Sequence, residues 1–323
     1  DYIDSFFDDL SAVWERCCSA TPWQSLPIPS IARTGMLYKK MGWSRWLKPT
    51  NAARRFGYFA TYCWAEGSKR HHVGNKHSTI VLKMASVKRF HRRYRNRLIT
   101  SSPRLNKLLQ GIKRLSVPKC KKQPITMSFL LLLHRTLNLA RPRQCLLWGS
   151  ILIGYFCMLR RSEYLLIGRT RHFYCLKTSN TYFSGKNGKP VKYALATSVT
   201  IGLEGAKNDQ FRRGAWWTMH VSGDHVICPL RRLYNIIQAR RELQMQSELH
   251  LCGSLRASTV SKAVKRTAAR AGVSHKAYAS QSIRISGATE LVTGGTDILS
   301  IKLLGRWASN CFEEFRVSQP KRH

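Results

Sequence analysis

Residues 67–203 contain a single carboxylate, Glu163. The whole chain of 323 residues has 55 Lys and Arg but only 16 Asp and Glu, so its formal net charge at pH 7 is +39. Ion pairs can neutralise only a minority of the basic side chains, and unneutralised like charge opposes a compact fold. We therefore expect cationic surfaces that face a polyanion. Nucleic acid is the first candidate partner, and an anionic membrane is the second.

The longest apolar run, residues 145–159, is shorter than the roughly 18–20 residues that span a bilayer. It is typical of a buried helix, so the sequence predicts no membrane partner. The ten cysteines include no Cys-x-x-Cys pair and no zinc-ligand spacing. The sequence therefore predicts no metal site, and unpaired cysteines are typical of the cytosol or nucleus.

Two prolines, Pro118 and Pro124, flank a basic cluster, as in an exposed linker. We expect a helical domain at 1–117, a basic linker at 118–126 and a mixed domain at 127–323. The fold class is α+β and helix-dominated, with a small antiparallel sheet. Apolar periodicity predicts helices at 51–66, 78–98, 103–115, 127–138, 143–159, 229–246, 282–292, 296–304 and 309–316, and strands at 195–203 and 215–221.

Basic side chains gather on the polar face of the helix predicted at 78–98. A small helical domain that grips one side of a duplex would have such a face, and the alternative is a helical bundle with a solvated face. A second basic group lies in the turn between the two predicted strands. The predicted DNA contacts are Lys83, Arg89, Arg92, Arg93, Arg212 and Arg213.

Glu163 follows the buried helix in the segment MLRRSEYLL, three residues after Arg160, so the two side chains are expected on one helical face. A buried arginine needs a partner, and Glu163 would orient it; a purely structural ion pair is the alternative. Three further segments contain candidate functional residues. They are Lys207 in a glycine-bracketed turn, Arg284 at the start of a predicted helix, and Arg306 with Trp307 just after a helix end.

In this order, the four segments resemble the boxes of the tyrosine recombinases, the family that includes phage-type integrases. MLRRSEYLL matches the first-arginine box, GAKNDQFRRG the hairpin lysine, QSIRISGAT the second-arginine box and LLGRWAS the His/Trp box. The sequences GAKNDQFRRG and GRWAS are most similar to those of eukaryotic Crypton-type transposon recombinases. The resemblance implies that Arg160, Lys207, Arg284 and Trp307 are catalytic and that Glu163 supports them.

Two positions depart from the family pattern. Gln281 stands where the family has a histidine, and Phe315 stands where it has the nucleophilic tyrosine. Phenylalanine is tyrosine without its hydroxyl, so the resemblance implies a catalytically inactive form. Such a form is either engineered to hold a DNA complex or a naturally inactive descendant.

The resemblance implies cleavage and rejoining of DNA strands through a 3′-phosphotyrosine intermediate, without a cofactor. The substrate would be double-stranded DNA, bound in the nucleus by a homodimer or homotetramer. Residues 1–117 would clamp the DNA, and 127–323 would form the catalytic domain. One alternative is a non-catalytic, sequence-specific DNA-binding protein derived from a recombinase, because residues 287–307 also fit a helix-turn-helix outline. A two-metal nuclease is less favoured, because no pair of carboxylates has a suitable context.

Overall fold

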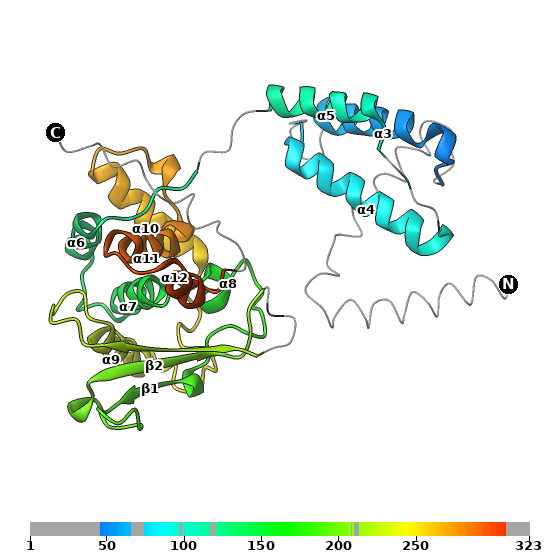
Figure 1. The fold of residues 1–323 in the computed structure, drawn as a ribbon. Helices are drawn as coiled ribbons and strands as arrows, with labels where there is room; N and C mark the ends of the chain where they lie inside the picture. Colours follow the sequence, from blue (N-terminus) through cyan, green and yellow to red (C-terminus); the bar gives the residue numbers. More distant parts are fainter. Residues whose placement is uncertain are drawn as a thin grey trace. The chain divides into compact units, whose positions relative to one another are not determined.

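The computed structural model describes residues 46–65, 74–96, 99, 101–116, 121–207, 209 and 213–307. The chain divides into two compact units, Asp1–Lys119 and Cys120–His323. The described residues form many helices and one three-stranded antiparallel sheet (Figure 1), which confirms the predicted α+β class. Among these residues, no helix combines the length and apolar character needed to span a bilayer.

The first unit contains three described helices, α3 (Pro49–Ala65), α4 (His77–Arg95) and α5 (Pro103–Leu115). Their apolar faces form a core that includes Phe56, Ile80 and Ile112. Helix α5 begins where predicted, because Ser102 accepts a hydrogen bond from the amide of Leu105 and Pro103 occupies the first turn. The prediction for 78–98 was too long at its C-terminal end, because Asn96 adopts a left-handed conformation that ends α4.

The DNA contacts predicted in α4 lie mostly on its surface. Arg89, Arg92 and Arg93 are exposed, and Lys83 is half-buried. The opposite face of α4 buries Ile80, Met84 and Val87 in the core. The helix is therefore amphipathic, with its arginines directed to solvent.

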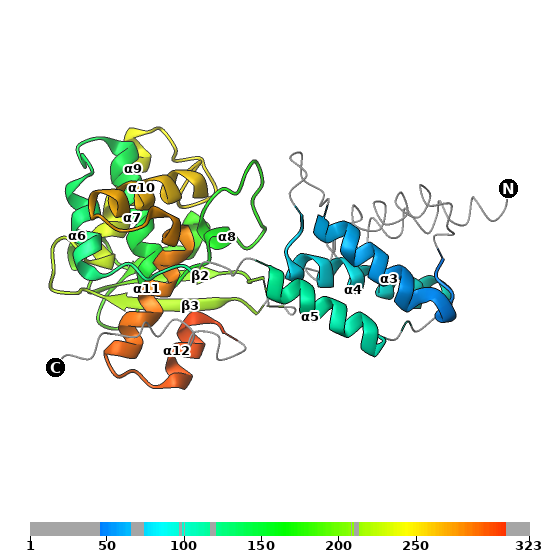
Figure 2. The same ribbon diagram turned by 90° about the horizontal axis from the view of Figure 1, so that it is seen from above.

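The second unit is built around α7 (Pro142–Phe156), which is buried along most of its length. Helix α7 packs against α9 (Pro229–Glu242) and α11 (Ser280–Thr293), as Figures 1 and 2 show. Helix α10 (Ala257–Arg270) packs against α11 and against α6 (Met127–Arg135). Helix α10 was not predicted, although its buried positions Ala257, Val260, Val264 and Ala268 recur at helical spacing.

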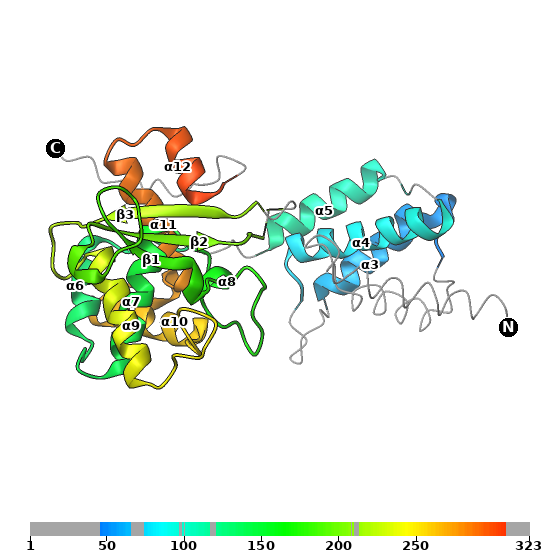
Figure 3. The same ribbon diagram turned by 90° about the horizontal axis from the view of Figure 1, so that it is seen from below.

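The sheet has the order β1–β2–β3, with β1 at Thr181–Ser184, β2 at Ser198–Leu203 and β3 at Ala215–His220. In the register, Ser184 pairs with Ser198, and Thr200 pairs with Thr218. The two predicted strands correspond to β2 and β3, whereas the four-residue β1 was missed. Helix α12 (Ile298–Gly305) lies beside β3 (Figure 3), where the indole nitrogen of Trp217 donates to the carbonyl of Leu304 at 3.0 Å. The short helices are α8 (Arg161–Tyr164), η1 (Thr178–Asn180), η2 (Tyr193–Leu195) and η3 (His275–Ala277).

Candidate active site

The chain turns sharply after α7, at the segment that contains Arg160 and Glu163. Helix α7 ends at Phe156, and Met158 has a left-handed φ of 44°. Arg160 is then the N-cap of α8, and its backbone amide donates to Glu163 Oε2 at 2.6 Å. The prediction that Arg160 and Glu163 share a helical face was therefore wrong. Glu163 reaches back to the N-cap residue in the manner of a capping box.

The side chains of the two residues also form an ion pair. Arg160 Nη1 lies 3.0 Å from Glu163 Oε1. The Glu163 side chain is completely buried, and that of Arg160 is 19% exposed. The carboxylate thus holds the backbone and the guanidinium of Arg160 together, which fixes the direction of the arginine.

Arg284 reaches the same carboxylate from α11. Its Nη1 donates to the Met158 carbonyl at 2.7 Å, and its Nη2 donates to the Gly305 carbonyl. Nη1 also lies 4.0 Å from Glu163 Oε2. Helix α11 approaches this closely because Gly287 has no side chain: a Cβ there would collide with the Tyr155 carbonyl at the end of α7.

Arg306 is the third arginine at Glu163; its sequence position made it a candidate functional residue, although the family resemblance implied no role for it. It ends α12 with a left-handed φ of 54°, and its Nη2 lies 2.5 Å from Glu163 Oε2. Its guanidinium stacks 4.3 Å from the ring centroid of Trp217 on β3. Gly305 lets Trp307 fold against the helix end, since a Cβ at this position would collide with the indole ring.

Arg160, Arg284 and Arg306 together with Glu163 are called the arginine cluster below. It places three guanidiniums around one buried carboxylate, so the positive charge exceeds the negative charge. Burial lowers the pKa of Arg306, and the charge of Arg160 lowers it further, while Glu163 opposes this shift. The guanidinium stays protonated, because its ordinary pKa is far above neutrality.

Two hydrogen-bond donors of Arg306 have no acceptor among the described residues. Its Nε and Nη1 atoms are buried, and neither has a hydrogen-bond partner among the described residues. Buried donors in native proteins are nearly always satisfied. An anion with several acceptor oxygens, such as a phosphate, fits this excess of charge and of donors.

The neighbouring side chains are poor nucleophiles. Burial raises the pKa of the Cys157 thiol to about 12, although the charge of Arg306 opposes the shift. Burial likewise raises the pKa of the Tyr155 and Tyr164 phenols. None of these three groups is therefore readily deprotonated to act as a nucleophile. Phe315 itself lies outside the described residues.

The remaining predicted site residues divide into two groups. Trp307 belongs with the arginine cluster, because the Arg284 guanidinium lies 4.4 Å from its ring centroid. Lys207 is exposed in the turn between β2 and β3, and Gln281 is exposed on α11. Neither side chain forms a hydrogen bond or ion pair with the rest of the described chain.

The turn that holds Lys207 is shaped by a carboxylate. Asp209 accepts hydrogen bonds from the amides of Arg213 at 3.1 Å and Gly214 at 2.9 Å. Gly214 has a φ of 70°, which favours glycine. Arg213 is exposed, whereas Arg212 lies outside the described residues. In the described part of the chain, no three His, Cys, Asp or Glu side chains are placed to hold a metal ion.

No protein-family model matches the sequence, and no curated protein matches it. Among solved structures, the XerA recombinase is similar at 14% identity with a TM-score of 0.39, over 89% of this chain and 92% of that chain. The XerH site-specific recombinase, bound to its difH substrate in a pre-cleavage complex, is similar at 16% identity with a TM-score of 0.43. That match covers 74% of this chain and 67% of XerH. These values describe a loose similarity, and they assign no role to a residue of this chain.

Proposed function

We propose that the arginine cluster binds a backbone phosphate of duplex DNA, and that the chain is a tyrosine recombinase in which Phe315 replaces the nucleophile. One observation carries this proposal: three guanidiniums from distant segments meet at one buried carboxylate, and Arg306 retains unsatisfied donors. The net charge of +39 supports a polyanionic substrate.

The proposed roles follow from where charge develops during phosphoryl transfer. Negative charge accumulates on the non-bridging oxygens, so Arg160, Arg284 and Arg306 would stabilise the transition state. Glu163 would act as a positioning residue, because it holds these guanidiniums at fixed distances. Trp307 and Trp217 would position Arg284 and Arg306 through their ring faces.

The strand-cleavage step requires a tyrosine at position 315. Its oxygen would attack the phosphorus, and the bond from phosphorus to the 5′-oxygen would break. The phenol proton would leave to solvent, and Lys207 would protonate the departing 5′-oxygen as general acid. Gln281 would donate a hydrogen bond to the phosphate, because an amide cannot act as a useful base. With Phe315, the chain would bind the DNA without cutting it.

A second candidate function is non-catalytic, sequence-specific DNA binding by a descendant of a recombinase. The glutamine at position 281 favours it, because a chain altered only to trap a complex would need no change at a second position. The nuclear location, the homodimer or homotetramer on DNA, the cofactor-free reaction and the Crypton-type subfamily remain predictions from the sequence resemblance.

The test is the substitution Phe315→Tyr. The parent chain first selects duplexes from a randomised library, and these duplexes are then nicked so that the short strand carrying the 5′-hydroxyl diffuses away after cleavage. We expect Phe315→Tyr to form a protein–DNA adduct that survives denaturation, while the matched control Phe315→Leu forms none. Arg306→Gln in the Phe315→Tyr background should lower adduct formation about 100- to 1,000-fold. No adduct on a tightly bound duplex would favour the non-catalytic alternative.

A further inference from the structure

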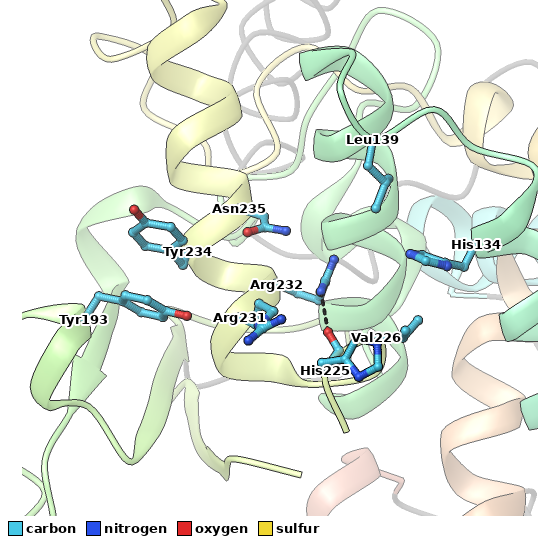
Figure 4. Close-up of a pocket in the computed structure, with 9 residues that line it drawn as sticks. All are labelled: His134, Leu139, Tyr193, His225, Val226, Arg231, Arg232, Tyr234 and Asn235. Carbon is cyan, nitrogen blue, oxygen red and sulfur yellow. Dashed lines mark hydrogen bonds between the residues drawn. The ribbon is translucent and has the colours of Figure 1, made fainter. Parts of the chain in front are cut away.

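The second unit contains a cavity that shares no residue with the arginine cluster. Its volume is about 450 Å³, within the range of roughly 300–1,000 Å³ that is typical of ligand pockets. It lies between α6, the start of α9, the loop before α9 and η2, as Figure 4 shows. The lining residues are His134, Leu139, Tyr193, His225, Val226, Arg231, Arg232, Tyr234 and Asn235.

Arg232 is the buried cation of this cavity, with only 5% of its surface exposed. Its Nη2 donates to the His225 carbonyl at 2.7 Å. Its Nη1 donates to the side-chain oxygen of Asn235 at 3.1 Å, in the amide orientation that satisfies both groups of Asn235. Its Nε is buried and has no hydrogen-bond partner among the described residues, and none of their carboxylates forms an ion pair with it. A buried guanidinium without a counter-charge is rare in a native protein.

Arg240, two turns further along α9, shows what a purely structural buried arginine looks like in this chain. It is 3% exposed, and its two Nη atoms donate to four backbone carbonyls, of His250, Leu251, Met245 and Glu248, at 2.6–3.0 Å. Arg232 makes fewer contacts and faces a cavity. This contrast indicates that Arg232 has capacity left for a ligand.

Besides Leu139, Val226 and Asn235, the lining consists of a second arginine, two histidines and two tyrosines. Burial lowers the pKa of His134, and the charges of Arg232, His225 and Arg135 lower it further. Asp224 opposes this shift, but its carboxylate already accepts hydrogen bonds from the amides of Val226 and Ile227. Tyr193 stacks on Tyr234 with ring centroids 4.0 Å apart, so the two rings form an aromatic pair in one wall, called the tyrosine wall below.

We propose that this cavity binds a nucleotide, with the phosphate at Arg232 and Arg231 and the base against the tyrosine wall. A phosphate beside the Arg232 guanidinium supplies the missing counter-charge. A planar base favours an aromatic surface. Either a free nucleotide or a nucleotide within a DNA strand can supply this chemistry, and competition between the two distinguishes the sources.

The probes are 5′-AMP, adenosine and inorganic phosphate, each titrated calorimetrically into the full chain. We expect 5′-AMP to bind more tightly than phosphate or adenosine alone. Arg231→Gln should weaken 5′-AMP binding about 10-fold, because Arg231 lines the cavity and is exposed. The matched control is Arg241→Gln, which removes an exposed arginine of the same helix outside the cavity. Arg232→Gln should abolish binding if the variant folds, as judged by circular dichroism.

The test is decided by Arg231→Gln and Arg241→Gln, because both replace exposed side chains and should not disturb folding. Equal binding of 5′-AMP to Arg231→Gln and Arg241→Gln would overturn the proposal, because general attraction to a basic surface would then explain the binding. Absence of 5′-AMP binding to the parent chain would overturn it as well. If a saturating 20-base-pair duplex displaces 5′-AMP, the cavity takes a DNA nucleotide; if both bind together, it takes a free nucleotide.

Discussion

Replacing Glu163 by glutamine should destabilise the protein strongly, and an oxyanion should restore part of the loss. The carboxylate accepts from the backbone amide of Arg160 and contacts the guanidiniums of Arg160 and Arg306 at 2.5–3.0 Å. Glu163→Gln preserves the shape but removes the only negative charge of the arginine cluster. It also turns an acceptor atom into a donor that faces another donor.

The size of the effect follows from the burial of the carboxylate, whose side chain is completely inaccessible. Removing one partner of a buried ion pair costs about 3–5 kcal/mol, because the other charge is left uncompensated. For a domain of this size, each kcal/mol shifts the Tm by about 2–4 °C, so the expected drop is about 6–20 °C. The control Glu242→Gln removes an exposed carboxylate on α9 and should shift the Tm by less than about 2 °C.

The assay is thermal and urea unfolding, with sodium chloride compared to sodium sulfate at equal ionic strength. A bound sulfate replaces the lost counter-charge, so the stability difference between the parent chain and Glu163→Gln should shrink in sulfate. The reasoning is refuted if Glu163→Gln costs less than about 1 kcal/mol, or if sulfate and chloride give the same difference.

Three further predictions concern the surroundings of the cluster, the cavity and the DNA-binding surface. Trp217→Phe removes the hydrogen bond to the Leu304 carbonyl and the indole face under Arg306, and urea unfolding should show a loss of about 1–3 kcal/mol. The lowered pKa of His134 means that the unfolded chain binds more protons below pH 6.5, so the free energy of unfolding should fall as the pH drops from 6.5. His134→Gln should flatten this pH profile. An unchanged profile would show that the lowered pKa of His134 is not the cause of the pH dependence. The affinity for duplex DNA should fall about 10³- to 10⁵-fold between 50 and 200 mM salt if ~6–10 phosphates are contacted. Arg92→Gln should make the slope of log affinity against log salt concentration shallower by about 0.9. An unchanged slope would exclude Arg92 as a phosphate contact.

The sequence predicts the parts of this fold that depend on local pattern. The continuous apolar run at 145–159 correctly indicated a buried helix, and the scarcity of carboxylates directed attention to Glu163. The helix predicted at 103–115 matches the bounds of α5, with Pro103 in its first turn. These features depend on neighbours in the chain, which is why periodicity and capping reveal them.

The parts that were missed depend on contacts between distant segments. Arg160 lies outside the helix because Met158 adopts a left-handed conformation, which no local pattern indicates. The position of Arg306 depends on the left-handed end of α12 and on Trp217, which comes from a strand 89 residues earlier. A basic residue within the apolar segment LLGRW was the only available signal for it. The unsatisfied Arg232 likewise becomes visible only when α9 is placed against its neighbours.

The most direct measurement is a crystal structure of the chain with Phe315 in place, bound to a selected duplex, since such a complex cannot be consumed by cleavage. We expect one backbone phosphate within about 2.7–3.2 Å of guanidinium nitrogens of both Arg160 and Arg306, with the Phe315 ring beside it. A duplex bound elsewhere, with no phosphate at the arginine cluster, would contradict the proposed function.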